Sequence, residues 1–573
     1  MAGDSSHNTM KKRQNQNRAI VLASIVLLIA VLCLLSFVER SAPNSTIKTP
    51  WDAFWYFIVT VTTVGYGDMK PNTIFGQLLG LIFILLSCGL ISVVLTASIR
   101  FMNGSHILYL RIRSARATKW YIFDSDSQEN RCLAGKLDVF HENAGIIFCR
   151  TERQLSGLLS FRHINTPLAV RDAAFACFRR SKKYEAELPV IFLTGDDEEE
   201  NLETALDILA ATHTAEVYCR TSVRFDTAPE GLHPFDTADL TARTYWADYP
   251  LTLTEKNVIL IGSGTLLDDL IEQAVLINTF GPLLRCRYHI FEEPDPDEGS
   301  CRERSSFLMD HPHIVDVISV IREETDGETS KMREASDGAG CPDSPLNDVL
   351  LFHSDRWNTN HECLKQADRI VVCTSSGIDN IRIAEKIRLL IPTKARIHVC
   401  GSTSIDGTHG FGSLRDIYTP ELILREDLLR RARALNDYYN NMQTDPSRRT
   451  AWEDLDMFTR RSNIAATDHM GTKLRILTGN LENSKPVTGG DGMLCLAMDN
   501  FVLNVVDRDL CRRIEHERWM RFHSLYGWTY GEVRDKARRK HPLMVPFEDL
   551  TPKEQALDDI SWEILATLYS CDA

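Results

Sequence analysis

The sequence of 573 residues lacks the short motifs by which many nucleotide-processing and metal-dependent enzymes are recognised. It has no Walker-type phosphate loop, no HExxH motif and no complete GxGxxG, and its 17 histidines are dispersed. Its 15 cysteines form no CxxC pair of the kind that holds structural zinc, and they are scattered through apolar runs such as Ile147-Phe148-Cys149. These absences disfavour an enzyme and a disulfide framework, and they indicate reduced, buried thiols.

An excess of basic residues is also missing. The chain has 64 Lys and Arg against 78 Asp and Glu, a net charge of −14, which argues against a nucleic-acid-binding protein. This total averages two unlike parts, because residues 1–119 carry 12 basic and 4 acidic residues and the remaining 454 carry 52 and 74. The first part therefore has a net charge of +8 and the second of −22. The length itself predicts about four structural units at about 150 residues each.

Two long uncharged runs lie in the basic part, Ala19–Val38 with 20 residues and Ile74–Ile99 with 26. Each is long enough to cross the roughly 30 Å of bilayer hydrocarbon as a helix. Four Lys and Arg precede the first run and five lie in residues 100–119, so the positive-inside rule places both ends in the cytoplasm and residues 39–73 outside. The sequence therefore predicts a multi-pass protein of the cell membrane, in contact with lipid, with its acidic part in the cytoplasm.

The external segment contains Trp51–Thr60, an aromatic stretch too short to span a bilayer, followed by TTVGYGD at residues 62–68. Non-helical backbone is tolerated at membrane depth where it lines a cavity. Gly65 and Gly67 permit backbone conformations that turn successive carbonyl groups toward one axis. Four such loops would form rings of oxygen atoms that replace the hydration shell of K⁺ as the permeant ion. The ion-binding residues would be Thr63, Val64, Gly65 and Tyr66.

This segment resembles the selectivity filter of the two-helix potassium channels. The resemblance implies a homotetramer whose filter is formed by Thr63–Gly67, with Trp55 near Asp68 supporting the filter from behind. One departure from the family lies just before the filter, because Val59 stands where many relatives have a glutamate. A Glu–Asp brace behind the filter is therefore not expected.

A second departure concerns the hinge of the inner helix. The usual gating glycine lies about twenty residues beyond the filter in the family, where this chain has Ser87. Gly89, or Gly80 on the other side, is the alternative hinge. Close packing between helices explains either glycine equally well.

From Trp120 onward, short apolar runs alternate with helical stretches such as Asn201–Ala211. The expected strands form two series. They are Trp120–Phe123, Gly145–Cys149, Val190–Thr194 and Glu216–Cys219, then Asn257–Ile261, Tyr288–Phe291, Arg369–Cys373 and Arg396–Cys400. This repetition of βα units predicts two doubly wound α/β sheets.

Two such units after a potassium pore resemble the RCK domains, which are Rossmann-like (TrkA-N) lobes. The resemblance implies that the lobes of four subunits form a cytosolic ring, and that ligand-driven expansion of the ring pulls the inner helices apart. The predicted parts are a transmembrane pore (1–101), a gating linker (102–117), a first lobe (118–250), a second lobe (251–402), a helical connector (403–505) and a small, mainly helical C-terminal domain (506–573).

The second lobe carries Gly262-Ser263-Gly264 between a strand and a helix, where phosphates can approach the helix N-terminus. The acidic residue expected after the next strand is Glu292. However, Leu267 replaces the third glycine of the fingerprint, and Glu292 lies farther along the chain than usual. A tight turn with no ligand therefore remains an alternative to a nucleotide site.

The first lobe has three carboxylates and no glycine in residues 123–130, which argues against a pyrophosphate site there. Arg150 after the second strand could pair with a phosphate or simply be solvated. The acidic run Asp196–Glu200 could hold a divalent cation, as in some relatives, but it is better explained as complementing the N-terminus of the helix that follows. Residues 323–345 are predicted to be a flexible insertion in the second lobe.

The C-terminal segment contains HERW at 516–519, GWTYGEVRD at 527–535 and KHP at 540–542. It resembles the RyR domain, a repeated module first named in ryanodine receptors, over about residues 506–570. Aromatic faces for stacking and cationic donors for phosphate would suit an adenine-type nucleotide. The candidate ligand residues are Trp519, Trp528, Tyr530, Arg534 and His541. Alternatively, both tryptophans are core residues, or the domain docks against a neighbouring subunit.

The leading hypothesis is a ligand-gated K⁺ channel of a prokaryotic cell membrane, with a small-molecule ligand in the cytosol and no catalytic cofactor. Two alternatives remain. One is a membrane-tethered enzyme that processes nucleotides or transfers hydride, and the other is a scaffold whose C-terminal domain recruits a protein partner.

Overall fold

The structure is a computed structural model with two compact units, Met1–Leu110 and Arg111–Ala573. It describes residues 28–62, 64–83, 105–115, 117–141, 143–151, 162–184, 187–212, 215–293, 349–353, 355–401, 407–482 and 491–569. Thr63, Ser87, Gly89, much of both apolar runs and the predicted insertion 323–345 lie outside these residues. Within the described ranges, no helix combines the length and the apolar character that a membrane crossing requires.

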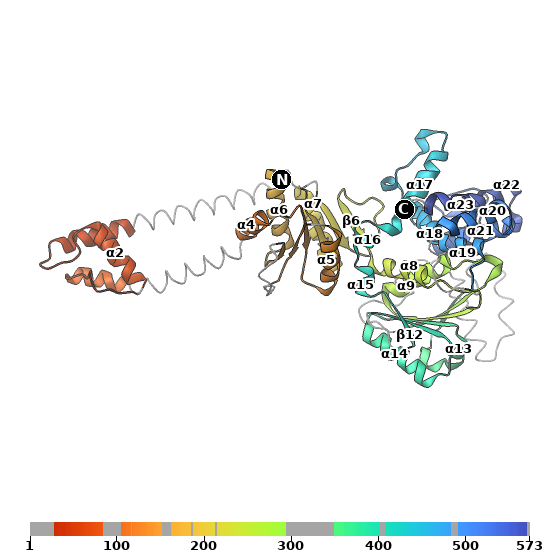
Figure 1. Ribbon diagram of the computed structural model, residues 1–573, viewed down its shortest axis with the longest axis horizontal. Helices are drawn as coiled ribbons and strands as arrows, with labels where there is room; N and C mark the ends of the chain where they lie inside the picture. The colour runs from red at the N-terminus through yellow and green to blue at the C-terminus, as the bar shows by residue number, and fades with distance from the viewer. Residues whose placement is uncertain are drawn as a thin grey trace. The chain divides into compact units, whose positions relative to one another are not determined.

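The first unit contains three described helical stretches. Residues 28–40 and 74–83 are helical parts of the two apolar runs, and α2 (Pro50–Val61) lies between them in the sequence (Figure 1). Helix α2 begins at Pro50 because Thr49 and Asp52 satisfy each other's backbone N–H groups in a capping box. A small apolar core joins the three stretches, formed by Leu32, Leu35, Ile47, Ala53, Phe57, Val61 and Phe83.

The second unit begins within α4 (Ser105–Ser114), and its first sheet has six parallel strands in the order β3-β2-β1-β4-β5-β6. Its strands are β1 (Lys119–Phe123), β2 (Ala144–Phe148), β3 (His163–Asn165), β4 (Val190–Leu193), β5 (Glu216–Arg220) and β6 (Leu232–Phe235). The helices between them are α5 (Gln128–Phe140), α6 (Val170–Tyr184) and α7 (Glu198–Thr212). The strand order changes direction between β1 and β4, which is where ligands bind in doubly wound sheets.

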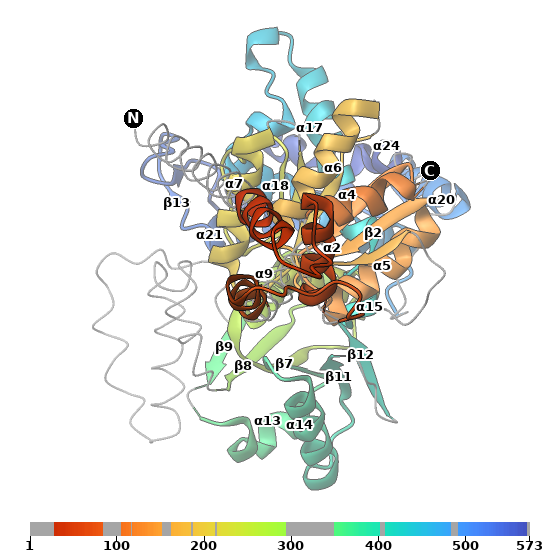
Figure 2. The same ribbon diagram turned by 90° about the vertical axis from the view of Figure 1, so that its left-hand side faces the viewer.

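A second parallel sheet has the order β12-β11-β10-β7-β8-β9. Its strands are β7 (Asn257–Gly262), β8 (Arg287–Glu292), β9 (Leu350–His353), β10 (Arg369–Cys373), β11 (Arg396–Cys400) and β12 (Thr408–Phe411). Helices α13 (His361–Gln366) and α14 (Gly377–Leu390) lie together beside it (Figure 2). Both doubly wound sheets predicted from the sequence are confirmed. β12 lies beyond residue 402, so the sheet extends into the segment predicted as connector.

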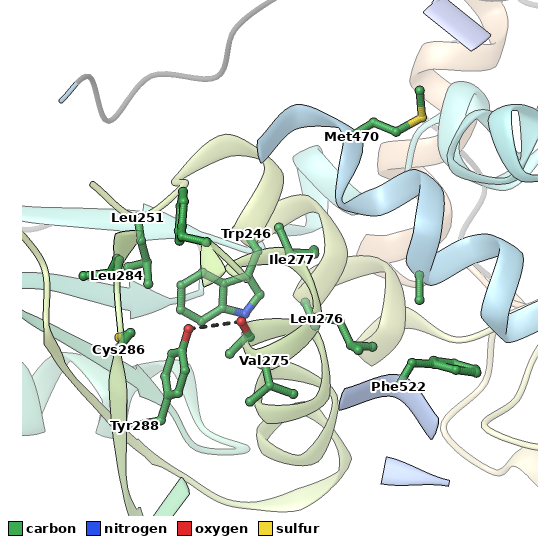
Figure 3. Packing of buried hydrophobic residues seen from close by; sticks show 14 of the residues in the cluster. Trp246, Leu251, Val275, Leu276, Ile277, Leu284, Cys286, Tyr288, Met470 and Phe522 are labelled. Carbon is green, nitrogen blue, oxygen red and sulfur yellow. Dashed lines mark hydrogen bonds between the residues drawn. The ribbon is translucent and has the colours of Figure 1, made fainter. Parts of the chain in front are cut away.

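The two lobes exchange helices. Helix α8 (Thr237–Asp248) follows the first sheet, but its Tyr245 and Trp246 are buried in the core of the second lobe. Figure 3 shows Trp246 in this core. In the opposite direction, α15 (Leu414–Ile417) and α16 (Pro420–Ile423) follow the second sheet and place Ile417 and Ile423 in the core of the first lobe. Each lobe therefore depends on side chains that the other lobe's part of the sequence supplies.

The remaining chain is mainly helical. The connector contains α17 (Asp427–Met442), α18 (Met457–Asp468), α19 (Met470–Thr478) and α20 (Asp491–Val502). The C-terminal part contains α21 (Arg508–Leu525), the short pair β13 (Thr529–Tyr530) and β14 (Lys540–His541), and four short helices or turns, α22 (Pro552–Gln555), η6 (Ala556–Asp559), α23 (Ile560–Glu563) and α24 (Leu565–Tyr569).

One apolar core joins the second lobe to these C-terminal helices. Helix α9 (Gly264–Ile277) is buried along almost its whole length. Its apolar residues share a cluster with Leu474 of the connector and with Phe522 and Trp562 of the C-terminal part. The C-terminal part therefore packs as an integral element of the second unit.

Candidate functional site

The candidate pore loop begins where α2 ends. Thr62 closes the helix by donating its backbone N–H and its hydroxyl to the carbonyl of Ile58, at 2.9 and 2.7 Å. The backbone N–H groups of Val64 and Gly65 both donate to the carbonyl of Val59, at 3.1 and 3.2 Å. Val59 thus anchors the candidate pore loop through its backbone carbonyl.

Both glycines of this loop have left-handed backbone conformations, with φ of +59° at Gly65 and +74° at Gly67. Residues with a β-carbon rarely adopt these angles. No atom of the chain lies within 4 Å of where a β-carbon would be at either position, so conformation and not space requires glycine here. Alternation with Val64 and Tyr66 is the pattern that lets successive carbonyl groups face one axis.

The aromatic support of the loop comes from α2. The indole N–H of Trp55 donates to the Asp68 carboxylate at 3.1 Å, and the Trp55 ring stacks on Tyr66 with centroids 6.4 Å apart and planes 5° apart. The structure therefore brings Trp55 and Asp68, the predicted supporting pair, together beside Tyr66 of the candidate pore loop. Thr63, the innermost predicted ligand, lies outside the described residues.

Glu39 links the two helices that flank the pore loop. Its side chain is fully buried, and it accepts hydrogen bonds from the backbone N–H groups of Asn72 and Thr73, both at 2.9 Å, and from the Ser45 hydroxyl at 3.2 Å. These bonds tie the end of helix 28–40 to the start of helix 74–83. Among the hinge candidates, only Gly80 is described, and a β-carbon there would overlap the Tyr56 hydroxyl, which supports the packing explanation.

In the first lobe, the chain's own carboxylate occupies the position between β1 and β4. Asp124 is 7% exposed and accepts the backbone N–H groups of Thr194 at 2.7 Å and Gly195 at 2.8 Å. Its other oxygen accepts the Asn130 side-chain amide at 2.7 Å. These are donors that an anionic ligand would use at this switch point. A phosphate there would have to displace Asp124.

The acidic run after β4 is used in ion pairs and caps. Arg150 pairs with Glu200 at 2.5 Å, and Arg220 pairs with Asp196 at 2.8 Å. Asp197 accepts the backbone N–H of Glu200 at 3.0 Å, in the first turn of α7. Among the described residues, the carboxylates of this run are not gathered into a group that could hold a metal ion.

In the second lobe, the glycine turn is shaped by its neighbour strand. A β-carbon on Gly262 would overlap Cys373 on β10 and would lie 2.7 Å from its carbonyl oxygen. Ser263 is 4% exposed, and its hydroxyl accepts the backbone N–H of Ser375 at 3.3 Å. Gly264 starts α9 with a φ of +72°. Close approach of β7 to β10 thus explains Gly262 without a ligand.

Glu292, the acidic residue predicted for the nucleotide site of the second lobe, lies on the strand next to Gly262. Glu292 ends β8 in register with Gly262, and the backbone N–H of Glu293 donates to the carbonyl of Gly262 at 2.8 Å. The structure therefore brings Gly262 and Glu292 together at the carboxyl ends of β7 and β8.

The C-terminal candidates separate into an aromatic cluster and an exposed pair. Helix α21 presents Trp519 and His523 one turn apart, with ring centroids 3.8 Å apart. His541 lies 4.9 Å from Trp519, and Trp528 lies 5.5 Å from His523. The connector adds Phe458, whose ring is 5.2 Å from Trp528.

Burial decides what these residues can do. Trp528 is 5% exposed and His541 9%, whereas Trp519 is half-buried. Burial lowers the pKa of His541 to about 4, with a further contribution from the charge of Arg534. Tyr530 is 46% exposed, and Arg534 is exposed. Only these last two of the five candidates are freely accessible to a ligand in this conformation.

A buried ionic cluster fastens the C-terminal part to the connector. Lys473 on α19 is fully buried, and its ammonium group lies 2.7 Å from the Glu515 carboxylate and 2.7 Å from the Ser561 hydroxyl. Arg518 also pairs with Glu515 at 2.7 Å. Burial acts to raise the pKa of Glu515, but the charges of Arg518 and Lys473 hold it well below its usual range. Burial and the Glu515 charge raise the pKa of nearby Asp558 to about 8.

A cavity of about 670 Å³ lies between the first lobe and the connector, and no sequence motif marks it. Its lining includes most of residues 221–236, Trp452 and four arginines, Arg224, Arg433, Arg460 and Arg461. The guanidinium groups of Arg433 and Arg460 lie 5.9 and 5.8 Å from the Trp452 ring centroid. The arginines already have partners: Arg461 pairs with Asp239 and Glu272, Arg224 with Asp269, Arg433 with Glu426, and Arg460 with backbone carbonyls. An anion entering this cavity would compete with those partners.

Two parts of the chain match known families. Residues 21–103 match the family model described as "Ion channel", and residues 505–572 match the model described as "RyR domain". A voltage-gated potassium channel of Aeropyrum pernix is 52% identical over 44 residues, which are 8% of this chain and 15% of that protein. Potassium voltage-gated channel subfamily A member 4 of Homo sapiens is 50% identical over 44 residues, 8% of this chain and 7% of that protein. The chain thus spans only a small part of the length of these relatives.

Among solved structures, the GsuK channel bound to ADP is 13% identical, with a TM-score of 0.32 over 72% of this chain and 98% of that one. The GsuK channel bound to NAD is 12% identical, with a TM-score of 0.31 over 72% of this chain and 85% of that one. At such low TM-scores these matches carry no argument about this chain.

Proposed function

We propose that this chain is the subunit of a potassium-selective channel that works as a homotetramer in a prokaryotic cell membrane. The observation that carries the proposal is the TVGYG loop itself. It follows a capped aromatic helix, its two described glycines have left-handed backbone, and a hydrogen bond joins Trp55 of that helix to Asp68 at the end of the loop. The match of residues 21–103 to an ion-channel family supports the same assignment.

The exposure of this region supports assembly with neighbouring subunits and lipid. In the single chain, Val64 is 52% exposed and Tyr66 is 69% exposed. Large apolar side chains of α2 are exposed as well, such as Trp51 at 69%. Large apolar side chains are rarely left in water in such numbers on one small unit. Conduction would require no covalent chemistry, because ions would exchange their water for carbonyl oxygens contributed by four loops.

The experiment is potassium flux into liposomes that contain the purified chain. Gly65→Ala adds only one methyl group, which meets no atom of its own chain but forces a residue with a β-carbon into a left-handed conformation. We expect it to abolish K⁺ selectivity, whereas Gly492→Ala, where a β-carbon also meets nothing, should conduct normally. The proposal fails if the unaltered protein carries no K⁺-selective flux, or if Gly65→Ala conducts as before.

We also propose that the second unit controls the pore by binding a small cytosolic ligand, of nucleotide type with an adenine base. Gating would then be a population shift, in which the ligand prefers one arrangement of the lobes over another. Exposed Tyr530 and Arg534 offer a ring and a cation for such a ligand. The Gly262–Gly264 turn with Glu292 is the second candidate site, but it has weaker support because packing against Cys373 already explains Gly262.

The ligand proposal is tested by adding ATP, ADP and NAD to the cytoplasmic side during the flux assay. We expect at least one of them to change the flux of the unaltered protein and to lose that effect in Arg534→Gln. Arg538→Gln removes an exposed charge four residues away and serves as the control. No effect of any nucleotide would contradict the proposal, and steady nucleotide turnover would favour the enzyme alternative instead.

A further inference from the structure

Three metal-ligating side chains from separate segments meet at one edge of the second sheet. His289 lies on β8, His353 is the last residue of the edge strand β9, and Cys363 lies on α13. Their ligand atoms all lie within 4.8 Å of one another. The two imidazoles are already in contact, with Nδ1 of His289 and Nε2 of His353 3.0 Å apart.

This geometry is close to that of a tetrahedral zinc site. Metal–nitrogen distances of about 2.0 Å and metal–sulfur distances of about 2.3 Å place neighbouring ligand atoms about 3.3–3.6 Å apart. The widest separation among the three atoms is 4.8 Å at most. Closing it requires side-chain movement of about 1 Å.

The histidines are held in place by neighbouring rings. The His353 ring stacks on both the His289 ring, 5.3 Å away, and the Phe291 ring, 4.3 Å away, so its orientation is restricted. Burial, together with the neighbouring imidazole, lowers the pKa of His289 to about 4, and burial also lowers the pKa of His353.

We propose that His289, His353 and Cys363 form a binding site for a single Zn²⁺ ion. Two imidazoles and one thiol suit zinc, whereas Ca²⁺ and Mg²⁺ prefer oxygen ligands. Three protein ligands leave a fourth position for water. The ion would join β8, β9 and α13 and would release the thiol proton on binding. Metal binding at this site does not depend on ion conduction or gating, so this proposal is independent of the proposed channel function.

The test is cobalt binding to the purified full-length chain in detergent, because Co²⁺ takes the place of Zn²⁺ and absorbs light. We expect one equivalent to produce a thiolate-to-cobalt charge-transfer band, and Zn²⁺ to remove the band by competition. Cys363→Ser should abolish the band, and His289→Gln should weaken cobalt binding by at least about 100-fold, since altered outer-shell partners alone cost about 10–100-fold.

Two controls separate this site from other thiols and imidazoles. Cys132→Ser removes a half-buried thiol in the first lobe, and His361→Ala removes an exposed imidazole on α13 itself. Both variants should keep the band and the affinity. The proposal is overturned if the unaltered chain shows no band, or if a band of full intensity survives in a folded Cys363→Ser variant, as judged by circular dichroism.

Discussion

The buried cluster around Glu515 allows a sharp test of how the C-terminal part is held. Glu515→Gln keeps the shape of the side chain but removes the anion that Lys473 and Arg518 share at 2.7 Å each. Lys473 is fully buried and Arg518 is 2% exposed, so water cannot replace the lost carboxylate. Two cations would then remain in the interior without their counter-ion.

The magnitude follows from the general cost of breaking a buried ion pair, about 3–5 kcal/mol. Lys473→Met should cost less, because Glu515 and Arg518 would still neutralise each other. A destabilisation of 1 kcal/mol shifts the midpoint of a large domain by about 2 °C, so Glu515→Gln should lower it by about 6–10 °C.

The assay is the thermal midpoint of the full chain in detergent, followed by tryptophan fluorescence. A protein of several domains need not unfold in two states, so hydrogen exchange of α19 and α21 should locate the change. Glu532→Gln, which removes an exposed carboxylate of the same domain, is the matched control. The reasoning is refuted if Glu515→Gln stays within about 1 °C of the unaltered chain, or if Lys473→Met is the more damaging change.

Three further outcomes follow from the contacts of single side chains. Gly262→Ala places a β-carbon 2.7 Å from the Cys373 carbonyl oxygen and should destabilise the second unit by about 1–3 kcal/mol, with or without ligand, in the same thermal assay. Gly377→Ala is the control and should be neutral, because the nearest atom to its β-carbon would be 3.9 Å away. The pKa of Asp558 is raised to about 8 in the folded chain, so the contribution of this carboxyl group to stability is complete at acidic pH and is lost as pH rises toward 8. Asp558→Asn should therefore flatten the decline in thermal midpoint between about pH 5 and pH 8. An unchanged slope would contradict this. Glu39→Ala leaves two partly buried backbone N–H groups without their acceptor and should cost about 2 kcal/mol, seen as a lower thermal midpoint of the chain in detergent. Glu39→Gln, which keeps one carbonyl acceptor, should lose less.

The strands that could be predicted from the sequence are those in the interior of the sheets. All eight predicted strands are present in the structure. They could be recognised because a parallel strand covered on both faces is a continuous apolar run, as in Val190–Leu193. The four edge strands were not predicted, because each is short and carries polar residues, as His163–Asn165 does. Edge strands are recognised through their pairing partner, which a local pattern does not contain.

The candidate sites follow the same division. The candidate pore loop is contiguous, so its residue types predicted its glycines, and the resemblance that they carry implied the Trp55–Asp68 pair, which is hydrogen-bonded in the structure. Gly262 matches a nucleotide fingerprint locally, yet it packs against Cys373, which lies on a distant strand. The rings of the C-terminal motif were recognised, but Phe458 of the connector is among the side chains that cover Trp528. In the last two cases the decisive contact is made by a residue from a distant part of the sequence, which a local motif does not contain.

The exchange of helices between the lobes has a consequence for the order in which the chain folds as it leaves the ribosome. Domains usually fold from the N-terminus as they are synthesised. Here the first lobe needs Ile417 and Ile423 to complete its core, so it must wait until the whole second sheet has been made. The second lobe in turn waits for Phe522 and Trp562. Residues up to Ile423 must therefore be translated before the first core can close, and residues up to Trp562 before the second, so both lobes leave apolar surface exposed during much of synthesis.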